Sequence, residues 1–141
     1  MNSFKITVLI LFTFVYSWSC KSKASKGLNG LPLASQWILE TIEHPDFKSK
    51  PISKTSFINI SKEMNSFSGN GGCNSISGQL EVDNNQIKFS NIIGTEMACD
   101  HLIQEQIFLQ YLEKSNKYVI QGGQMTLYEN NTKLMTLESY R

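Results

Sequence analysis

The sequence contains three cysteines, and two of them, Cys73 and Cys99, are spaced so that they could react with each other or with the nearby His101. In an oxidising compartment they favour a disulfide, whose loop of about 26 residues implies roughly 3–4 kcal/mol of stabilisation. Three alternatives remain open: reduced thiols packed as small apolar groups, a metal site with His101, and a nucleophilic Cys99 served by His101. The metal site lacks further ligands and the nucleophile lacks an orienting residue, so we expect no catalytic residue, no metal and no cofactor.

Cys73 lies in a glycine-rich stretch, residues 68–78, that contains Gly69, Gly72 and Gly78. Glycine permits positive φ or a close approach of backbones, so the stretch predicts a tight bend or bulge in a sheet. It is no phosphate loop, because it lacks a Lys-Ser/Thr pair and opens no helix. Asn74 suits hydrogen bonds to the local backbone of such a bend, and a role in ligand binding is the open alternative.

This bend must be held by strands, and seven or eight short segments have the alternation or the β-branched and aromatic content of strands. They are residues 36–43, 55–60, 64–68 and 76–82, a strand with Ile87 and Phe89, and residues 118–120, 125–128 and 134–137. Hairpin turns are predicted at Asp83–Asn85, Gly122–Gly123 and Asn130–Asn131.

Residues 100–115 predict the single helix, with Asp100 as its N-cap. Its apolar arc is formed by Ile103, Ile107, Phe108, Tyr111 and Leu112. We therefore expect an α+β fold, mainly antiparallel β, with a strongly curved or barrel-like sheet of seven to eight short strands packed around one α-helix.

Glu105 lies on this helix between Leu109 and Leu112, away from the glutamine-rich face. A carboxylate in that position needs partners, because an unpaired buried charge is costly. We hypothesise that Glu105 accepts hydrogen bonds from backbone N–H groups of residues 69–74. The alternative is that its carboxylate reaches solvent at the edge of the helix.

Residues 1–19 are predicted to be a signal peptide, with Lys5 followed by the apolar run Ile6–Tyr16, which is too short to span a bilayer. Cys20 follows Ser17-Trp18-Ser19, which resembles a bacterial lipobox, so we expect cleavage before Cys20 and lipidation of its thiol. A plain secretory peptide is the alternative. Residues 20–34 then form a lipidated flexible tether, and residues 35–141 form the domain.

The formal net charge is +1, and it falls to zero without residues 1–19, because Lys5 is the one charged side chain there. Nucleic-acid binding needs a basic surface that neutralises phosphates. We therefore expect no nucleic-acid partner.

The order of these features resembles the META domain family, which includes HslJ-like heat-shock proteins, over roughly residues 36–138. The combination of Gly72-Cys73-Asn74 with Thr95-x-Met97-Ala98-Cys99 carries the resemblance, together with Trp37–Leu39 and the helical Glu105, Phe108 and Leu112. The resemblance implies structural roles for seven residues. They are Gly69, Gly72, Asn74, Gly78, Thr95, Met97 and Glu105.

Members of this family are typically small envelope or secreted domains, often lipoproteins, connected with stress, antibiotic tolerance or secretion and without an established enzymatic activity. The resemblance therefore implies a non-enzymatic binding or structural module, linked to envelope integrity or stress tolerance. We expect it at the bacterial cell envelope, anchored by its lipid in the outer membrane, with an envelope protein or cell-wall component as partner. The alternative is a carrier of a small apolar ligand between helix and sheet.

Overall fold

The computed structural model describes residues 36–47, 56–61, 63, 65–100 and 102–140. The predicted signal peptide, Cys20 and the tether lie outside these residues. The strands are β1 (Gln36–Ile42), β2 (Phe57–Ser61), β3 (Ser66–Asn70), β4 (Ser75–Asp83), β5 (Gln86–Gly94), β6 (Lys117–Gln121), β7 (Gln124–Glu129) and β8 (Thr132–Tyr140). The helices are η1 (Pro45–Phe47), a single 3-10 turn, and α1 (Leu102–Lys114). Within the described part of the chain, no helix has the length and apolar content needed to span a membrane.

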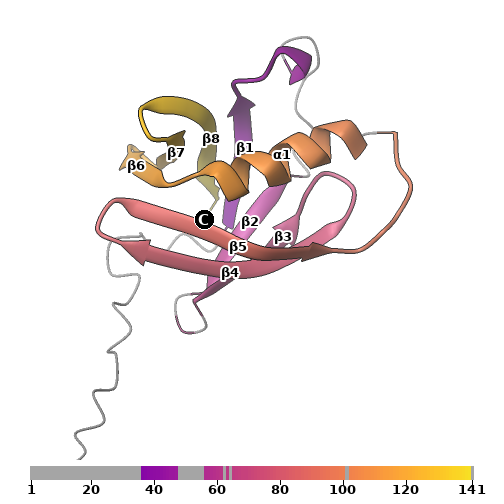
Figure 1. The fold of residues 1–141 in the computed structure, drawn as a ribbon, viewed down its shortest axis with the longest axis horizontal. Helices are drawn as coiled ribbons and strands as arrows, with labels where there is room; N and C mark the ends of the chain where they lie inside the picture. The colour runs from indigo at the N-terminus through magenta and orange to yellow at the C-terminus, as the bar shows by residue number, and fades with distance from the viewer. Residues whose placement is uncertain (1–35, 48–55, 62, 64, 101, 141) are drawn as a thin grey trace, which may run out of the picture.

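The eight strands form a closed ring in chain order, each antiparallel to its neighbours, with β8 returning to pair with β1 (Figure 1). Turn residues explain this order, because they join consecutive strands as hairpins. Asn84 (φ 57°), Gly122 (φ 61°) and Asn130 (φ 58°) adopt the left-handed conformation that such turns require. The predicted α+β class, with a curved sheet and one α-helix, is confirmed.

Helix α1 connects β5 to β6, the junction where the ring is most weakly paired. Gln86 and Lys117 form the one residue pair in register there. Figure 1 shows α1 lying alongside β5, across this part of the ring. Phe108 and Leu112 are fully buried, so the helix completes the hydrophobic core where strand pairing is short.

The predicted helix needs two corrections. The described helix spans Leu102–Lys114 rather than 100–115: Asp100, the expected N-cap, and Ser115 are not helical, and residue 101 lies outside the described residues. Ile103, expected on the buried arc, is 67% exposed, whereas Glu105 is buried. Residues two apart on a helix point about 200° from each other, so only one of the two can face the sheet. Glu105 is the one that faces inward, because N–H groups of the β3–β4 turn donate hydrogen bonds to its carboxylate.

Tyr118 on β6 offers a test of this core through its pH dependence. Its side chain is buried and its hydroxyl donates to the Asn84 carbonyl at 2.8 Å. Burial raises the pKa of Tyr118 above its ordinary value of 10.0. The folded state therefore keeps this proton at a pH where the unfolded chain releases it, so stability falls as pH rises above about 10.

We expect Tyr118→Phe to lose about 1 kcal/mol at neutral pH, because the hydrogen bond is removed. The variant should also show a smaller decrease in the free energy of unfolding between about pH 9 and 11, as measured by urea unfolding. Tyr128→Phe, a less buried tyrosine on the neighbouring β7, is the control. Equal alkaline slopes in the two variants would contradict this account.

Candidate functional site

The turn between β3 and β4 holds the segment that precedes α1 at three consecutive residues. Cys73 is joined to Cys99 by a disulfide, with the two Cα atoms 6.3 Å apart. The Asn74 side-chain oxygen accepts from the Met97 N–H at 2.8 Å. The Ser75 carbonyl accepts from the Thr95 N–H at 3.1 Å. The structure thus contains the predicted disulfide, and residues 95–99 run alongside residues 73–75.

Asn74, which is only 3% exposed, is the centre of a polar network. Besides the Met97 N–H, its Oδ1 accepts from the Thr95 hydroxyl at 2.8 Å. Its Nδ2 donates to Glu105 Oε1 at 2.7 Å and to the Met97 carbonyl at 3.5 Å. Both acceptor sites and both donors of the amide are therefore occupied. The Asn74 side chain therefore cross-links the turn to the 95–99 segment and the helix, rather than bonding to the backbone of its own bend as expected.

Glu105 receives three N–H donors from this turn. Its Oε2 accepts from the backbone N–H groups of Cys73 at 3.1 Å and Asn74 at 2.6 Å. Its Oε1 accepts from the Asn74 side chain. These donors replace the water that a carboxylate loses on burial. The hypothesis that Glu105 accepts from the bend is confirmed, and the alternative of a solvent-reaching side chain at the helix edge is wrong.

Steric contacts and backbone conformation explain why glycines occupy these positions of the stretch. A Cβ on Gly69 would lie 2.0 Å from the Phe57 carbonyl oxygen of β2, and one on Gly78 would lie 2.7 Å from the Phe67 ring. Gly72 has φ +123°, which side chains disfavour. Gly71, which the sequence analysis did not single out, passes the Glu105 carboxylate so closely that a Cβ would lie 2.7 Å from it.

Ser56 is a second residue that sequence reasoning missed. It is buried, and its hydroxyl donates to the Gly71 carbonyl at 3.0 Å. The consecutive glycines at 71 and 72 were the available signal for the close approach, but Ser56 carries no signal of its own. Ser56 and Glu105 thus hold the turn through hydrogen bonds to Gly71, Cys73 and Asn74.

Of the predicted motif residues, Met97 contributes its backbone and not its side chain. Its N–H and carbonyl bond to Asn74, while its side chain is 55% exposed. The disulfide uses both thiols, so neither the nucleophile nor the metal alternative has the free sulfur it requires. His101 lies outside the described residues. Among those described, no group of three or more His, Cys, Asp or Glu side chains is placed to hold a metal ion.

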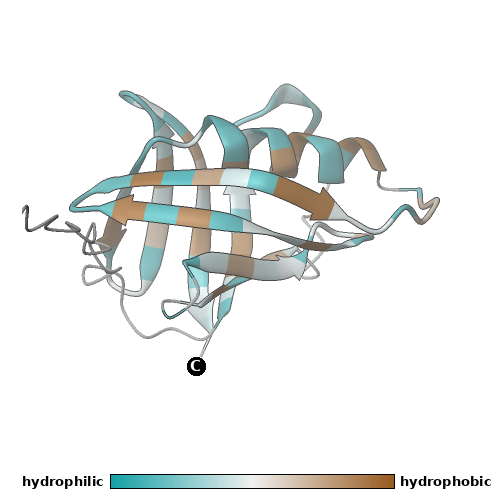
Figure 2. Cartoon of the chain, turned by 60° about the horizontal axis from the view of Figure 1, so that its bottom comes forward, coloured by the Kyte–Doolittle hydropathy of each residue, from teal (hydrophilic) through white to brown (hydrophobic). Residues whose placement is uncertain are grey.

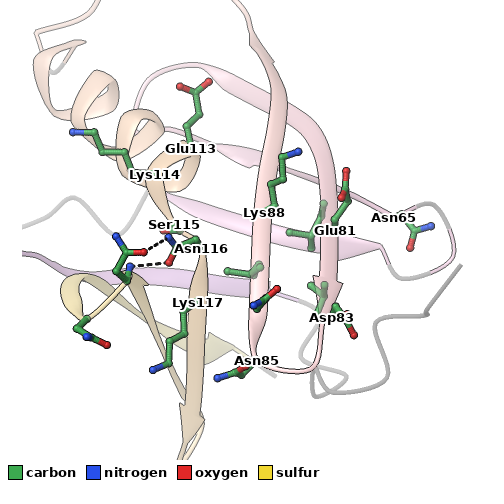
Figure 3. A pocket seen from close by; sticks show the side chains of 16 residues that line it. Asn65, Glu81, Asp83, Asn85, Lys88, Glu113, Lys114, Ser115, Asn116 and Lys117 are labelled. Atoms are coloured by element: carbon green, nitrogen blue, oxygen red, sulfur yellow. Dashed lines mark hydrogen bonds between the residues drawn. The ribbon is translucent and has the colours of Figure 1, made fainter.

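A polar groove of about 970 Å³ lies at the opposite end of β4 and β5 from the disulfide, beside the end of α1 (Figure 3). Its lining includes Leu80, Val82 and Ile87, and its other lining residues are polar. Asn116 and Asn130 close one side through mutual hydrogen bonds of 2.9 and 2.7 Å. Three acidic and three basic side chains balance its charge: Glu81, Asp83, Glu113, Lys88, Lys114 and Lys117.

Comparisons with known proteins identify a sequence family and a shared fold. The sequence profile of the META domain matches residues 31–140. No curated protein sequence matches the chain.

Among solved structures, the NMR structure of a protein from Burkholderia xenovorans is similar with a TM-score of 0.60 and 22% identity, over 76% of this chain and 82% of that one. A DUF4847 family protein from Bacteroides vulgatus is similar with a TM-score of 0.54 and 12% identity, over 77% of this chain and 93% of that one. At these identities the likeness shows the fold alone.

Proposed function

This chain belongs to the META domain family, and from that premise we propose that it is a non-enzymatic binding or structural module of the bacterial cell envelope. In this proposal, a lipid on Cys20 anchors the domain to the outer membrane. Its role is to contact an envelope protein or cell-wall component in support of envelope integrity or stress tolerance.

One observation carries the proposal: the polar groups of the motif residues form hydrogen bonds with one another. Asn74 uses both donors and both acceptors internally, and Glu105 accepts three N–H groups. A catalytic acid, base or nucleophile must instead be within reach of a substrate atom. The arrangement therefore suits a scaffold that holds a loop in one conformation.

The disulfide supports the envelope location, because disulfides persist in oxidising compartments outside the cytosol. Cys73 and Cys99 are joined across 26 residues of sequence. The lipobox-like Ser17-Trp18-Ser19-Cys20 stands 16 positions before the first residue of β1, Gln36. A chain of that length reaches at most about 50–60 Å when extended, so an anchored domain would stay near the membrane.

Replacing Cys20 tests the anchor. We expect Cys20→Ala to move the protein from the membrane pellet to the soluble fraction and to abolish labelling by a radioactive or clickable fatty acid, because the acylated thiol is gone. Ser19→Ala, which keeps the cysteine, is the matched control and should remain in the pellet. A Cys20→Ala protein that stays fully in the membrane fraction would overturn the lipid-anchor proposal.

The alternative function, a carrier of a small apolar ligand between helix and sheet, requires an apolar cavity there. The groove in Figure 3 is instead lined mainly by amide and charged side chains and lies beside the end of α1. No specific observation favours the carrier over the binding module.

A further inference from the structure

Exposed apolar side chains gather at the end of the molecule that carries the disulfide. The described residues include six large apolar side chains that are exposed, and four of them lie within residues 93–103. These four, which we call the apolar end, are Ile93 (69% exposed), Met97 (55%), Leu102 (37%) and Ile103 (67%). Figure 2 shows the hydrophobic end of β5 and the hydrophobic first turn of α1 at the same end. Single exposed apolar residues are ordinary, but a group of them is typical of an interaction site.

The backbone that carries the apolar end is fixed before any partner arrives. Residues 73–75 hold the 95–99 segment through the disulfide and two backbone N–H donors, and Glu105 ties the first part of α1 to the same turn. Binding through a preorganised loop costs less conformational entropy than binding through a flexible one. The unbranched Met97 side chain can still adapt to the surface it meets.

The charged side chains that the structure describes within residues 93–103 have one sign. Glu96 and Asp100 are exposed carboxylates within the segment. The sequence contains no lysine or arginine from Phe89 to Glu113, nor from Ser66 to Leu80. A second copy of the chain would bring like charges together, and an anionic lipid surface would be repelled. A basic partner is the complementary one.

We propose that the apolar end binds a protein segment in which apolar side chains stand next to lysine or arginine. This inference rests on the proposed binding function and names its surface. The apolar contacts supply the affinity, and the two carboxylates favour a basic partner and speed its association.

The test uses the folded, disulfide-bonded protein and a phage-displayed library of random twelve-residue peptides. We expect the selected peptides to combine apolar residues with Lys or Arg. A synthetic peptide of the most enriched sequence should bind at least about tenfold more weakly to Met97→Ser/Ile103→Ser. Glu96→Gln/Asp100→Asn should weaken it several-fold and reduce the dependence of affinity on salt. Val119→Ser, an exposed apolar residue on β6, is the control and should leave binding unchanged.

Thermal unfolding of each variant checks that it is folded. Peptides without basic residues, or peptides whose binding Met97→Ser/Ile103→Ser leaves unchanged, would overturn the surface while leaving the binding module intact. A library that yields no binder would overturn the assignment of the binding surface too.

In cells, a photo-crosslinking residue at position 103 should capture a segment containing Lys or Arg, identified by mass spectrometry. Crosslinks to a second copy of the chain, or to residues 21–33 of the same chain, would show that the proposed partner is wrong and that this segment occupies the surface instead. The Cys20→Ala fractionation tests the anchor separately.

Discussion

Glu105→Ala is expected to lower the free energy of unfolding by about 3 kcal/mol, because it leaves two buried N–H donors and one partly buried N–H donor without an acceptor. These donors are the backbone N–H groups of Cys73 and Asn74 and the Asn74 side-chain amide. In a domain of roughly 105 residues such a loss corresponds to a fall in Tm of about 12–20 °C. Thermal unfolding followed by circular dichroism measures it.

Two further substitutions sharpen this prediction. Glu105→Gln keeps the shape but turns an NH2 group toward N–H donors, so its loss should be smaller than that of alanine and still clearly measurable. Glu113→Ala removes an exposed carboxylate from the same helix and should change stability by less than about 0.5 kcal/mol. An unchanged Tm for Glu105→Gln would show that the carboxylate is no essential acceptor.

The second large effect is expected from the disulfide. Cys73→Ser/Cys99→Ser should lower the free energy of unfolding by about 3 kcal/mol, because the unfolded chain regains the entropy that the cross-link across 26 residues removes. Chemical denaturation with urea measures the loss, and the unaltered protein in dithiothreitol should show a similar one.

The effect should also be visible locally. Without the disulfide, residues 95–99 keep the hydrogen bonds to Asn74 and Ser75 but lose their covalent attachment. Amide hydrogen exchange should therefore accelerate in this segment more than in the β7–β8 hairpin. Equal stability of the unaltered protein and Cys73→Ser/Cys99→Ser would contradict the role assigned to the cross-link. A uniform acceleration of amide exchange across the domain would contradict it as well.

Local patterns predicted most elements of the fold. Alternating apolar residues marked β4 and β5, and the Gly122–Gly123 and Asn130–Asn131 pairs lie at the predicted hairpin turns. The inward face of α1 was predicted correctly at Ile107, Phe108, Leu112 and Glu105, but not at Ile103. A helical wheel offered Ile103 as buried, but the N–H donors of the β3–β4 turn decide in favour of Glu105. The closing pair of β1 with β8 joins residues about 100 positions apart, which no local signal specifies.

The site shows the same division. The cysteine pair and the glycines were recognisable from residue type and spacing. The bonds of Asn74 to Thr95 and Met97 were not, because they depend on the path of a loop that the disulfide and the helix place. Ser56 lies far from the motif in sequence and meets it only through the pairing of β2 with β3.

The central claim is that Asn74 and Glu105 act as one unit that holds the helix and the 95–99 segment to the β3–β4 turn. A double-mutant cycle with Asn74→Ala, Glu105→Ala and the double variant measures this directly. We expect the sum of the two single-variant losses in unfolding free energy to exceed the loss in the double variant. The difference, which is the coupling free energy between the two residues, should be at least about 1.5 kcal/mol. Losses that add to within about 0.3 kcal/mol would show that the two residues stabilise the protein independently, and the account would be wrong.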